Sequence, residues 1–274
     1  MIETRADRLP FDGDQTIAGM IHLPALPGAP AYDGSRDRIR TRMLEDATAL
    51  EAGGVDAIVL ENFGDGPFYP DSVPAHTVAD MTALATTLTS AVDVPVGINV
   101  LRNDAAAALS VAAAADADFV RINVHVGAAV TDQGVLEGQA HETLRQRERI
   151  DADVGILADL HVKHATPLGA ASLERTALET VVRGHADGVV VSGAGTGQVT
   201  PLGDVATVRE TLATLEHDVP VVVGSGVTPS TVADCFEAGA DGVIVGTALK
   251  QGGKTTNPVS RDRVETLRVA AAGD

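Results

Sequence analysis

Short runs rich in valine and isoleucine recur eight times along the chain, and this repetition restricts the fold more than any other feature. The runs cover residues 16–21, 55–60, 94–99, 118–123, 154–160, 187–192, 219–224 and 241–246. The segments between them are long enough for helices, and in the first of these Ile39, Met43, Ala47 and Leu50 fall on one helical face. Eight units of strand and helix predict a (β/α)8 TIM barrel, because an open doubly wound sheet usually has fewer strands and a dinucleotide fingerprint.

Four of the strands are preceded by the same local phrase, in which the small residues that end a helix are followed by an aspartate. The phrase reads GGVDAIV, ADADFV, GHADGVV and AGADGVI, with Asp56, Asp118, Asp187 and Asp241 as its aspartates. This internal repeat, with its short loops, is typical of parallel neighbouring strands. No linker divides the chain, so we expect residues 1–274 to form one barrel domain.

The charge of the chain restricts its partners. It has 38 acidic and 20 basic residues, for a net charge of −18, which repels nucleic acid and anionic lipid. Lysine occurs only as Lys163, Lys250 and Lys254, and this composition is typical of a protein from a salt-rich cytoplasm. The N-terminus lacks a signal-peptide pattern and no apolar run is long enough to span a bilayer, so the expected location is the cytoplasm.

Polar residues interrupt the buried strands, and side-chain alternation predicts where they point. In GILADLHVKHATPL, residues 155–168, every second side chain from Ile156 to residue 162 is apolar and faces the helices. The inward set in this segment is Leu157, Asp159, His161 and Lys163. From the first four strands, the inward polar set is His22, Glu61, Asn99, Arg121, Asn123 and His125. Alternation points the His164 side chain the other way, so His164 is expected to support the residues that contact the ligand instead of contacting the ligand itself.

Charged residues from neighbouring strands would be buried together by this arrangement. An unpaired buried charge is costly, so we expect Asp159, Glu61, Arg121 and Lys163 to compensate one another. Because active sites of such barrels lie at the C-terminal mouth, the cluster predicts catalysis there. A structural ion-pair layer in the barrel centre is the alternative.

The last two strands are followed by glycine-containing turns, GSGVTPSTVADCFEAG and GTALKQGG. Loops at these two positions form the usual phosphate site of a TIM barrel. We therefore expect exposed backbone N–H groups near Gly224, Ser225, Gly226, Gly246 and Thr247 to bind phosphate. Gly226→Asp is expected to abolish this binding without disturbing the fold.

Other cofactor and nucleophile motifs are weak or absent in the sequence. The segment SGAGTGQVTP lacks the context of a nucleotide-binding loop, no histidines and cysteines have zinc-site spacing, and no G-x-S-x-G elbow occurs. The lone Cys235 is expected in the core. No cofactor is predicted, and a divalent metal held by Glu61 or Asp159 remains an open alternative.

Five long segments resemble the BtpA family: GMIHLPALPGAP, LENFGDGPF, FVRINVHVGAAVTDQGVLEGQAHE, ILADLHVKHA and VVVGSGVTPSTVADCFEAGADGVIVGTALK. The resemblance implies a barrel that binds a phosphate-bearing ligand, and together with the composition it suggests a haloarchaeal member. In cyanobacteria the family name is tied to photosystem I biogenesis, whereas other members accompany sugar or nucleoside genes. Residues that match its motifs are His22, Glu61, Asn62, Asn99, Arg121, Asn123, Asp132, Asp159, Lys163 and His164, and His161 lies between two of them.

Together these features predict an enzyme that acts on a small phosphorylated metabolite, either a sugar phosphate or a nucleotide-derived compound. The candidate catalytic residues are Asp159, Lys163, Glu61, Asn123 and His22, with Lys163 as nucleophile or general acid–base. The candidate substrate-binding residues are Asn62, Asn99, Arg121, His161, His164 and Asp132. The reaction is left open among lyase or aldolase, isomerase and phosphohydrolase chemistry, and a homo-oligomer is also left open. The alternative is a non-catalytic assembly factor that uses the barrel as a ligand sensor.

Overall fold

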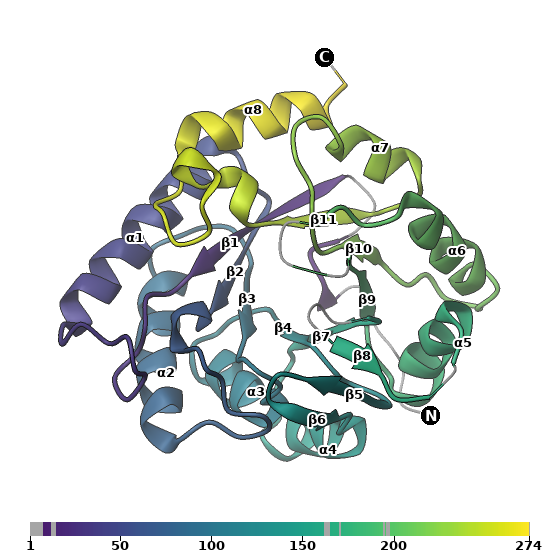
Figure 1. The fold of residues 1–274 in the computed structure, drawn as a ribbon, viewed down its shortest axis with the longest axis horizontal. Helices are drawn as coiled ribbons and strands as arrows, with labels where there is room; N and C mark the ends of the chain where they lie inside the picture. Colours follow the sequence, from purple (N-terminus) through teal and green to yellow (C-terminus); the bar gives the residue numbers. More distant parts are fainter. Residues whose placement is uncertain are drawn as a thin grey trace.

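The structure is a computed structural model that describes residues 8–11, 15–161, 165–169, 171–193, 195 and 198–273. Eight parallel strands close into a barrel in the order β1-β11-β10-β9-β7-β4-β3-β2 (Figure 1). The strands are β1 (Thr16–His22), β2 (Ala57–Glu61), β3 (Val96–Asn99), β4 (Phe119–Ile122), β7 (Gly155–Asp159), β9 (Gly188–Val191), β10 (Val221–Val223) and β11 (Gly242–Val245). The predicted (β/α)8 barrel is therefore confirmed.

Helices surround the barrel on its outer side (Figure 1). They are α1 (Arg36–Gly53), α2 (Ala75–Thr89), α3 (Ala105–Ala114), α4 (Ala140–Arg149), α5 (Leu173–Leu178) with its π-helical continuation η3 (Glu179–Arg183), α6 (Leu202–Leu212), α7 (Val232–Glu237) and α8 (Arg261–Ala271). The described residues also include the short 3₁₀ turns η2 (Phe63–Asp65), η4 (Thr247–Leu249) and η5 (Gln251–Gly253). Helix α1 illustrates the local rules: the Ser35 side chain accepts the Arg38 N–H at its start, and Gly54 ends it with a φ of 91°.

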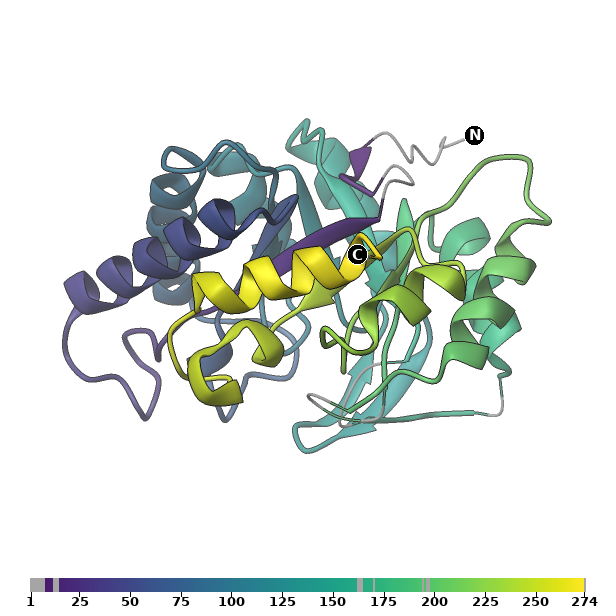
Figure 2. The same cartoon turned by 90° about the horizontal axis from the view of Figure 1, so that it is seen from above.

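Two apolar layers hold the barrel together. The larger one lies between the strands and the helices, and the smaller one fills the barrel interior. The inner layer includes Leu9 and Phe11, which precede β1. They pack against the other residues of this layer at the N-terminal end of the barrel. Gly188 leaves room for this segment, because a Cβ atom there would lie 2.6 Å from Leu9 Cδ1. Figure 2 shows residues 8–11 at the opposite end of the barrel from the antiparallel hairpin described below.

The repeated aspartates have a structural role at the N-terminal ends of the strands. Each carboxylate accepts the backbone N–H of a residue at the start of a neighbouring strand. The pairs are Asp56 with Ile17 (2.8 Å), Asp118 with Val96 (2.7 Å), Asp187 with Ile156 (2.9 Å) and Asp241 with Val221 (2.7 Å). The four aspartates precede the second, fourth, sixth and eighth strands of the barrel, and each one bonds to the strand before its own. The repeat unit is therefore two strands long.

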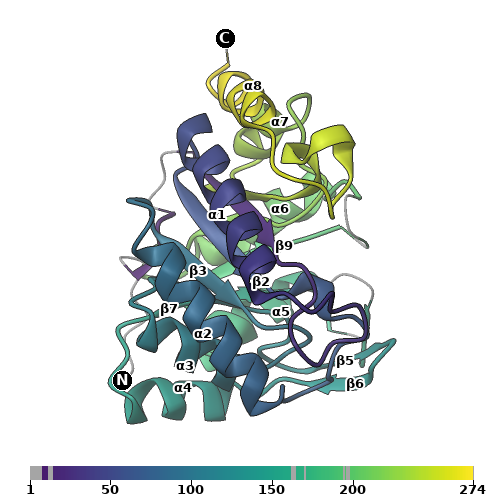
Figure 3. The ribbon, with the colours of Figure 1, turned by 90° about the vertical axis from the view of Figure 1, so that its left-hand side faces the viewer.

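A small antiparallel sheet, which the sequence did not predict, lies at the C-terminal mouth. It has the order β6-β5-β8 and consists of β5 (Ala128–Thr131), β6 (Gly134–Glu137) and β8 (Ala165–Pro167). Figure 3 shows β5 and β6 at the same end of the barrel as the loop that follows β11.

The hairpin also changes where the residues after β4 point. Val124 packs against Ala129 and Leu136 of the hairpin instead of facing the helices. His125 does not point into the barrel as predicted, and its Nε2 lies 2.8 Å from the carbonyl oxygen of Gly184. Alternation fails here because β4 ends at Ile122, so the side-chain parity of a strand no longer applies.

Among the residues that the structure describes, no helix has the length and apolar character required to cross a membrane.

Candidate functional site

A cavity of about 670 Å³ lies among the C-terminal ends of the barrel strands. Eleven of the predicted site residues line it, namely His22, Glu61, Arg121, Asn123, Asp132, Asp159, Gly224, Ser225, Gly226, Gly246 and Thr247. Parallel strands carry all of their C-terminal ends to one face, which is why residues far apart in sequence meet here. The volume is in the range of cavities that bind small molecules.

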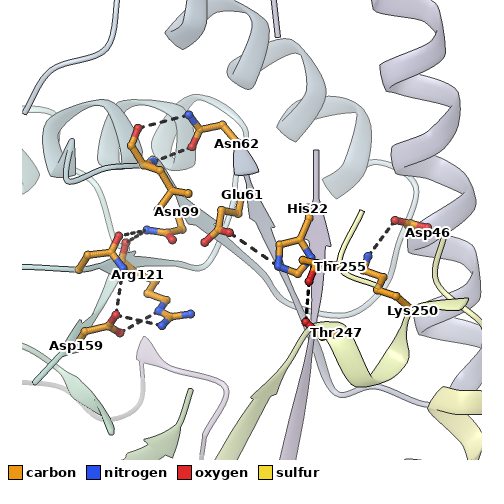
Figure 4. Close-up of polar contacts among 12 residues, drawn as sticks. His22, Asp46, Glu61, Asn62, Asn99, Arg121, Asp159, Thr247, Lys250 and Thr255 are labelled. Atoms are coloured by element: carbon orange, nitrogen blue, oxygen red, sulfur yellow. Dashed lines mark hydrogen bonds and ion pairs between the residues drawn. The ribbon is translucent and has the colours of Figure 1, made fainter. Parts of the chain in front are cut away.

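Arg121 and Asp159 form a buried ion pair on one side of the cavity (Figure 4). Arg121 donates from Nε to Oδ1 at 2.9 Å and from Nη2 to Oδ2 at 3.1 Å, and Asn123 Nδ2 donates to Oδ2 at 3.1 Å. Burial lowers the pKa of Arg121, but the charge and hydrogen bonds of Asp159 outweigh burial, so the pKa is raised overall. The predicted pairing of buried charges is thus confirmed for these two residues. Since both carboxylate oxygens already accept hydrogen bonds, Asp159 is better placed to hold Arg121 than to remove a proton from a ligand.

His22 and Glu61 form a second pair at the adjacent ends of β1 and β2. His22 Nε2 lies 3.9 Å from Glu61 Oε1, and both side chains are about nine-tenths buried. The His22 ring contacts Phe63 edge to face and fills the space beside Gly246, where a Cβ atom would lie 2.7 Å from its Cε1. An imidazole beside a carboxylate can accept or deliver a proton near neutral pH. This pair is therefore the described part of the cavity best suited to proton transfer.

Two predicted substrate-binding residues lie behind the cavity wall. Asn99 Nδ2 donates to the Arg121 carbonyl at 2.8 Å and to Asn123 Oδ1 at 3.2 Å. Asn62 Oδ1 accepts the Leu101 N–H at 2.7 Å. Neither lines the cavity, so the structure places both as residues that position their neighbours and not as ligand contacts.

Three other predictions concern the segment after β7. His161 is half-buried and is not among the residues that line the cavity. Lys163 and His164 lie outside the described residues, so their predicted roles stay predictions. Within the described parts of the chain, no three His, Cys, Asp or Glu side chains are grouped to hold a metal ion.

The glycine turns after β10 and β11 meet the cavity, but their backbone groups are not equally available. The Gly224 N–H donates to the Val191 carbonyl at 2.9 Å, and so the exposed N–H predicted for it is wrong. Ser225 Oγ accepts the Gly193 N–H at 2.7 Å. Gly226 has a φ of 70°, and a Cβ atom there would overlap the backbone of residues 198 and 199. Gly226→Asp would therefore disturb the fold, contrary to the prediction from sequence.

Two arginines that sequence reasoning missed also line the cavity. Arg102 follows β3 and is 8% exposed, while Arg263 lies in the first turn of α8 and donates from Nε to the Ala248 carbonyl at 2.6 Å. Arg102 could have been found as a basic residue just beyond the C-terminal end of a predicted barrel strand. Arg263 gave no such signal, because its helix reaches the site only through the packing of α8 beside the β11 loop.

The sequence comparisons decide the family. The model of the BtpA family matches residues 13–273. The chain belongs to the BtpA family. An uncharacterised protein from Pyrococcus horikoshii is 42% identical over 254 residues, covering 93% of this chain and 95% of the relative. The photosystem I biogenesis protein BtpA of Synechocystis is 41% identical over 262 residues, covering 96% of this chain and 90% of that protein.

Solved structures of other proteins share the barrel fold of this BtpA-family chain. A thiamine phosphate pyrophosphorylase from Pyrococcus furiosus matches with a TM-score of 0.60 at 17% identity, covering 96% of this chain and 98% of that one. A 3-hexulose-6-phosphate synthase matches with a TM-score of 0.58 at 18% identity, covering 93% and 99%. At these identities the likeness shows the fold alone.

Proposed function

We propose that the protein is an enzyme that acts on a small phosphorylated metabolite, a sugar phosphate or a nucleotide-derived compound, at the C-terminal mouth of the barrel. One observation carries this proposal: a single cavity joins the glycine turns after β10 and β11 to buried ionisable groups from β1, β2, β4 and β7. The turns suit the phosphate, and the ionisable groups suit the chemistry. The names of the two similar barrels, which refer to phosphorylated compounds, support the same class of ligand.

The residues divide between binding and chemistry. Phosphate binding is assigned to the backbone around Gly226 and Thr247, with the Arg263 guanidinium beside it. Proton transfer is assigned to His22 and Glu61, and Arg121, held by Asp159, supplies a fixed positive charge that stabilises negative charge in the transition state. Asp132, at the tip of the β5–β6 hairpin, also lines the cavity.

Lys163 keeps its proposed role as nucleophile or general acid–base from the sequence. Lysine can act in either way because it loses its proton when desolvated, whereas arginine does not. Lys163→Arg is expected to preserve ligand affinity and remove turnover, and borohydride with substrate should trap an adduct on Lys163 if a Schiff base forms. Substantial turnover by this variant would leave the lysine with an electrostatic role only.

The decisive experiment is a thermal-shift screen of phosphorylated metabolites in high salt. A ligand present at 100 times its Kd adds about 2.7 kcal/mol to the stability of the folded state. Arg263→Gln should weaken the binding of every ligand that the screen finds. Arg261→Gln is the matched control, because Arg261 lies on the same helix turn but pairs with Glu265 at 2.7 Å. If no phosphorylated compound shifts the melting temperature, or if the two variants behave alike, the proposed phosphate site is refuted.

A non-catalytic assembly factor is the second candidate, favoured by the 41% identical relative that is named for photosystem I biogenesis. Separately, the acidic composition supports the proposal that the protein functions in a salt-rich cytoplasm. Ligand binding without turnover of any compound in the screen, together with undiminished partner binding after loss of both Asp159 and Lys163, would favour this sensor role over catalysis.

A further inference from the structure

Aromatic side chains are few in this chain, and two of them face the cavity instead of the core. The sequence has five phenylalanines, two tyrosines and no tryptophan. Phe11, Phe119 and Phe236 pack in or against the apolar layers of the barrel. Phe63 and Phe68, from the loop after β2, belong to neither layer; both are half-buried and line the cavity. Rings in this position are available to contact a ligand.

Phe63 lies one side chain away from the glycine turn after β11. In the closed order of strands, β2 and β11 are the two neighbours of β1, and His22 ends β1. The His22 ring fills the space beside Gly246, and its centroid is 4.9 Å from that of the Phe63 ring. A ligand whose phosphate lies on this turn therefore reaches the loop after β2 once it extends past His22.

Hydrogen bonds hold the loop that carries both rings. At its start, Asp65 accepts a hydrogen bond from Asn62 at 3.0 Å, and Asn62 accepts the Leu101 N–H at 2.7 Å (Figure 4). At its end, the Tyr69 carbonyl accepts the Arg102 N–H at 3.1 Å. The loop after β2 is thus tied to the loop after β3 at two points. Side chains on a loop that is ordered before binding lose less conformational entropy when a ligand arrives.

Charged side chains line the same cavity and restrict what kind of group can lie against the rings. Glu61, at the end of β2, and Arg102, after β3, are each 8% exposed. A hydrocarbon chain placed here would remove these groups from water without offering them a hydrogen bond, which is unfavourable. A heteroaromatic ring has apolar faces for the phenylalanines and nitrogen or oxygen atoms at its edge for the charged groups. Aromatic rings that pack together also gain energy beyond the burial of area, which favours such a ring over a sugar alone.

We propose that the ligand carries a planar heteroaromatic ring at the end remote from its phosphate, and that Phe68 packs against this ring. The substrate class is then a ring-bearing phosphate ester, such as a nucleoside 5′-monophosphate, and not a sugar phosphate alone. This proposal rests on the proposed function, because it needs the phosphate to lie on the turns after β10 and β11. Among the described residues the Phe68 ring contacts no other aromatic ring, whereas Phe63 already packs edge to face with His22.

The test compares ring-bearing phosphates with the same sugar phosphate lacking the ring. The probes are AMP and UMP, which carry a purine and a pyrimidine, and ribose 5-phosphate. Affinities are measured by titration calorimetry at one fixed salt concentration. At least one nucleotide is expected to bind about fivefold or more tightly than ribose 5-phosphate, as the lower end of base–aromatic stacking energies implies.

Variants separate a contact with Phe68 from a general effect of ligand size. Phe68→Ala should bring the ratio of nucleotide to ribose 5-phosphate affinity to about 2 or less, because the stacking contribution is lost. Its affinity for ribose 5-phosphate should stay nearly unchanged, which also shows that the variant is folded. Phe68→Leu, which keeps an apolar side chain and loses the flat ring, should give an intermediate ratio. Tyr69→Ala is the matched control and should keep the original ratio, because the neighbouring Tyr69 is 51% exposed and does not line the cavity.

The outcomes distinguish the ring proposal from the proposed function. Equal affinities for the three probes, or a ratio that either Phe68 variant leaves unchanged, would overturn the ring proposal while leaving the phosphate site intact. Loss of the ratio in Tyr69→Ala as well would assign the effect to the loop as a whole and would also overturn the contact with Phe68. Failure of all three probes to bind would instead count against the proposed function, and the ring proposal would fall with it.

Discussion

The buried pair of Arg121 and Asp159 should show strong energetic coupling. Their side chains are 4% and 0% exposed and share two hydrogen bonds, with a third from Asn123 to the carboxylate. Removing one partner of such a pair leaves a buried charge without compensation, and so Arg121→Met and Asp159→Leu should each lower the free energy of unfolding by about 3 kcal/mol or more. The double variant buries no unpaired charge and should lose only about 2 kcal/mol. The double variant would then be about 4 kcal/mol more stable than the sum of the two single losses predicts.

The assay is urea unfolding at fixed salt, followed by far-ultraviolet circular dichroism because the chain has no tryptophan. Equal m-values across the four proteins would show that the unfolding transition is unchanged. The same cycle on Arg36 and Asp80 is the matched control: this pair is also joined by two hydrogen bonds, but the arginine side chain is 58% exposed. Its coupling should stay below about 1 kcal/mol. If the buried pair gives additive losses within about 0.5 kcal/mol, the reasoning from burial is refuted.

Three further predictions concern stability. Burial lowers the pKa of His125 to about 4 from its ordinary 6.5, so below about pH 6.5 the unfolded chain binds a proton that the folded protein does not. Stability should therefore fall as the pH drops from about 6.5 to about 4, by up to about 3 kcal/mol, and by less in His125→Gln; identical pH profiles for the two proteins would contradict this. Lys250 lies 3.1 Å from Asp46 with both side chains buried, so Lys250→Met should cost about 3 kcal/mol in urea unfolding. The exposed Lys254→Met should change stability by less than about 0.5 kcal/mol, and equal losses would show that burial of the pair is not the cause. The net charge of −18 predicts a melting temperature that rises from 0.01 M to 1 M KCl, as the Debye length falls from about 30 Å to about 3 Å. A melting temperature independent of salt would remove the argument for adaptation to a salt-rich cytoplasm.

Local rules of the sequence predicted most of the barrel, because each strand and helix carries its own pattern. Alternation placed Asp159 and Arg121 on the inner face and Ile156 and Ala158 on the outer face, as the structure confirms. The same rule failed at His125, since alternation holds only while the chain remains a strand and β4 ends at Ile122. The small sheet escaped prediction for a related reason: β8 pairs with β5 across 34 to 38 residues, and such pairing depends on the fold more than on local composition.

The sequence by itself determined that eight strands with inward polar ends would close into a barrel, since periodicity and glycine turns act over short stretches of chain. Only the tertiary structure decided which of those polar groups line the cavity. It placed Asn62 and Asn99 behind the cavity wall, and it brought Arg102, from the loop after β3, and Arg263, from a helix that carries no site motif, into the cavity. The physical reason is that a cavity is made of side chains from many strands and helices. Which atoms remain exposed in it depends on hydrogen bonds formed between segments far apart in the chain.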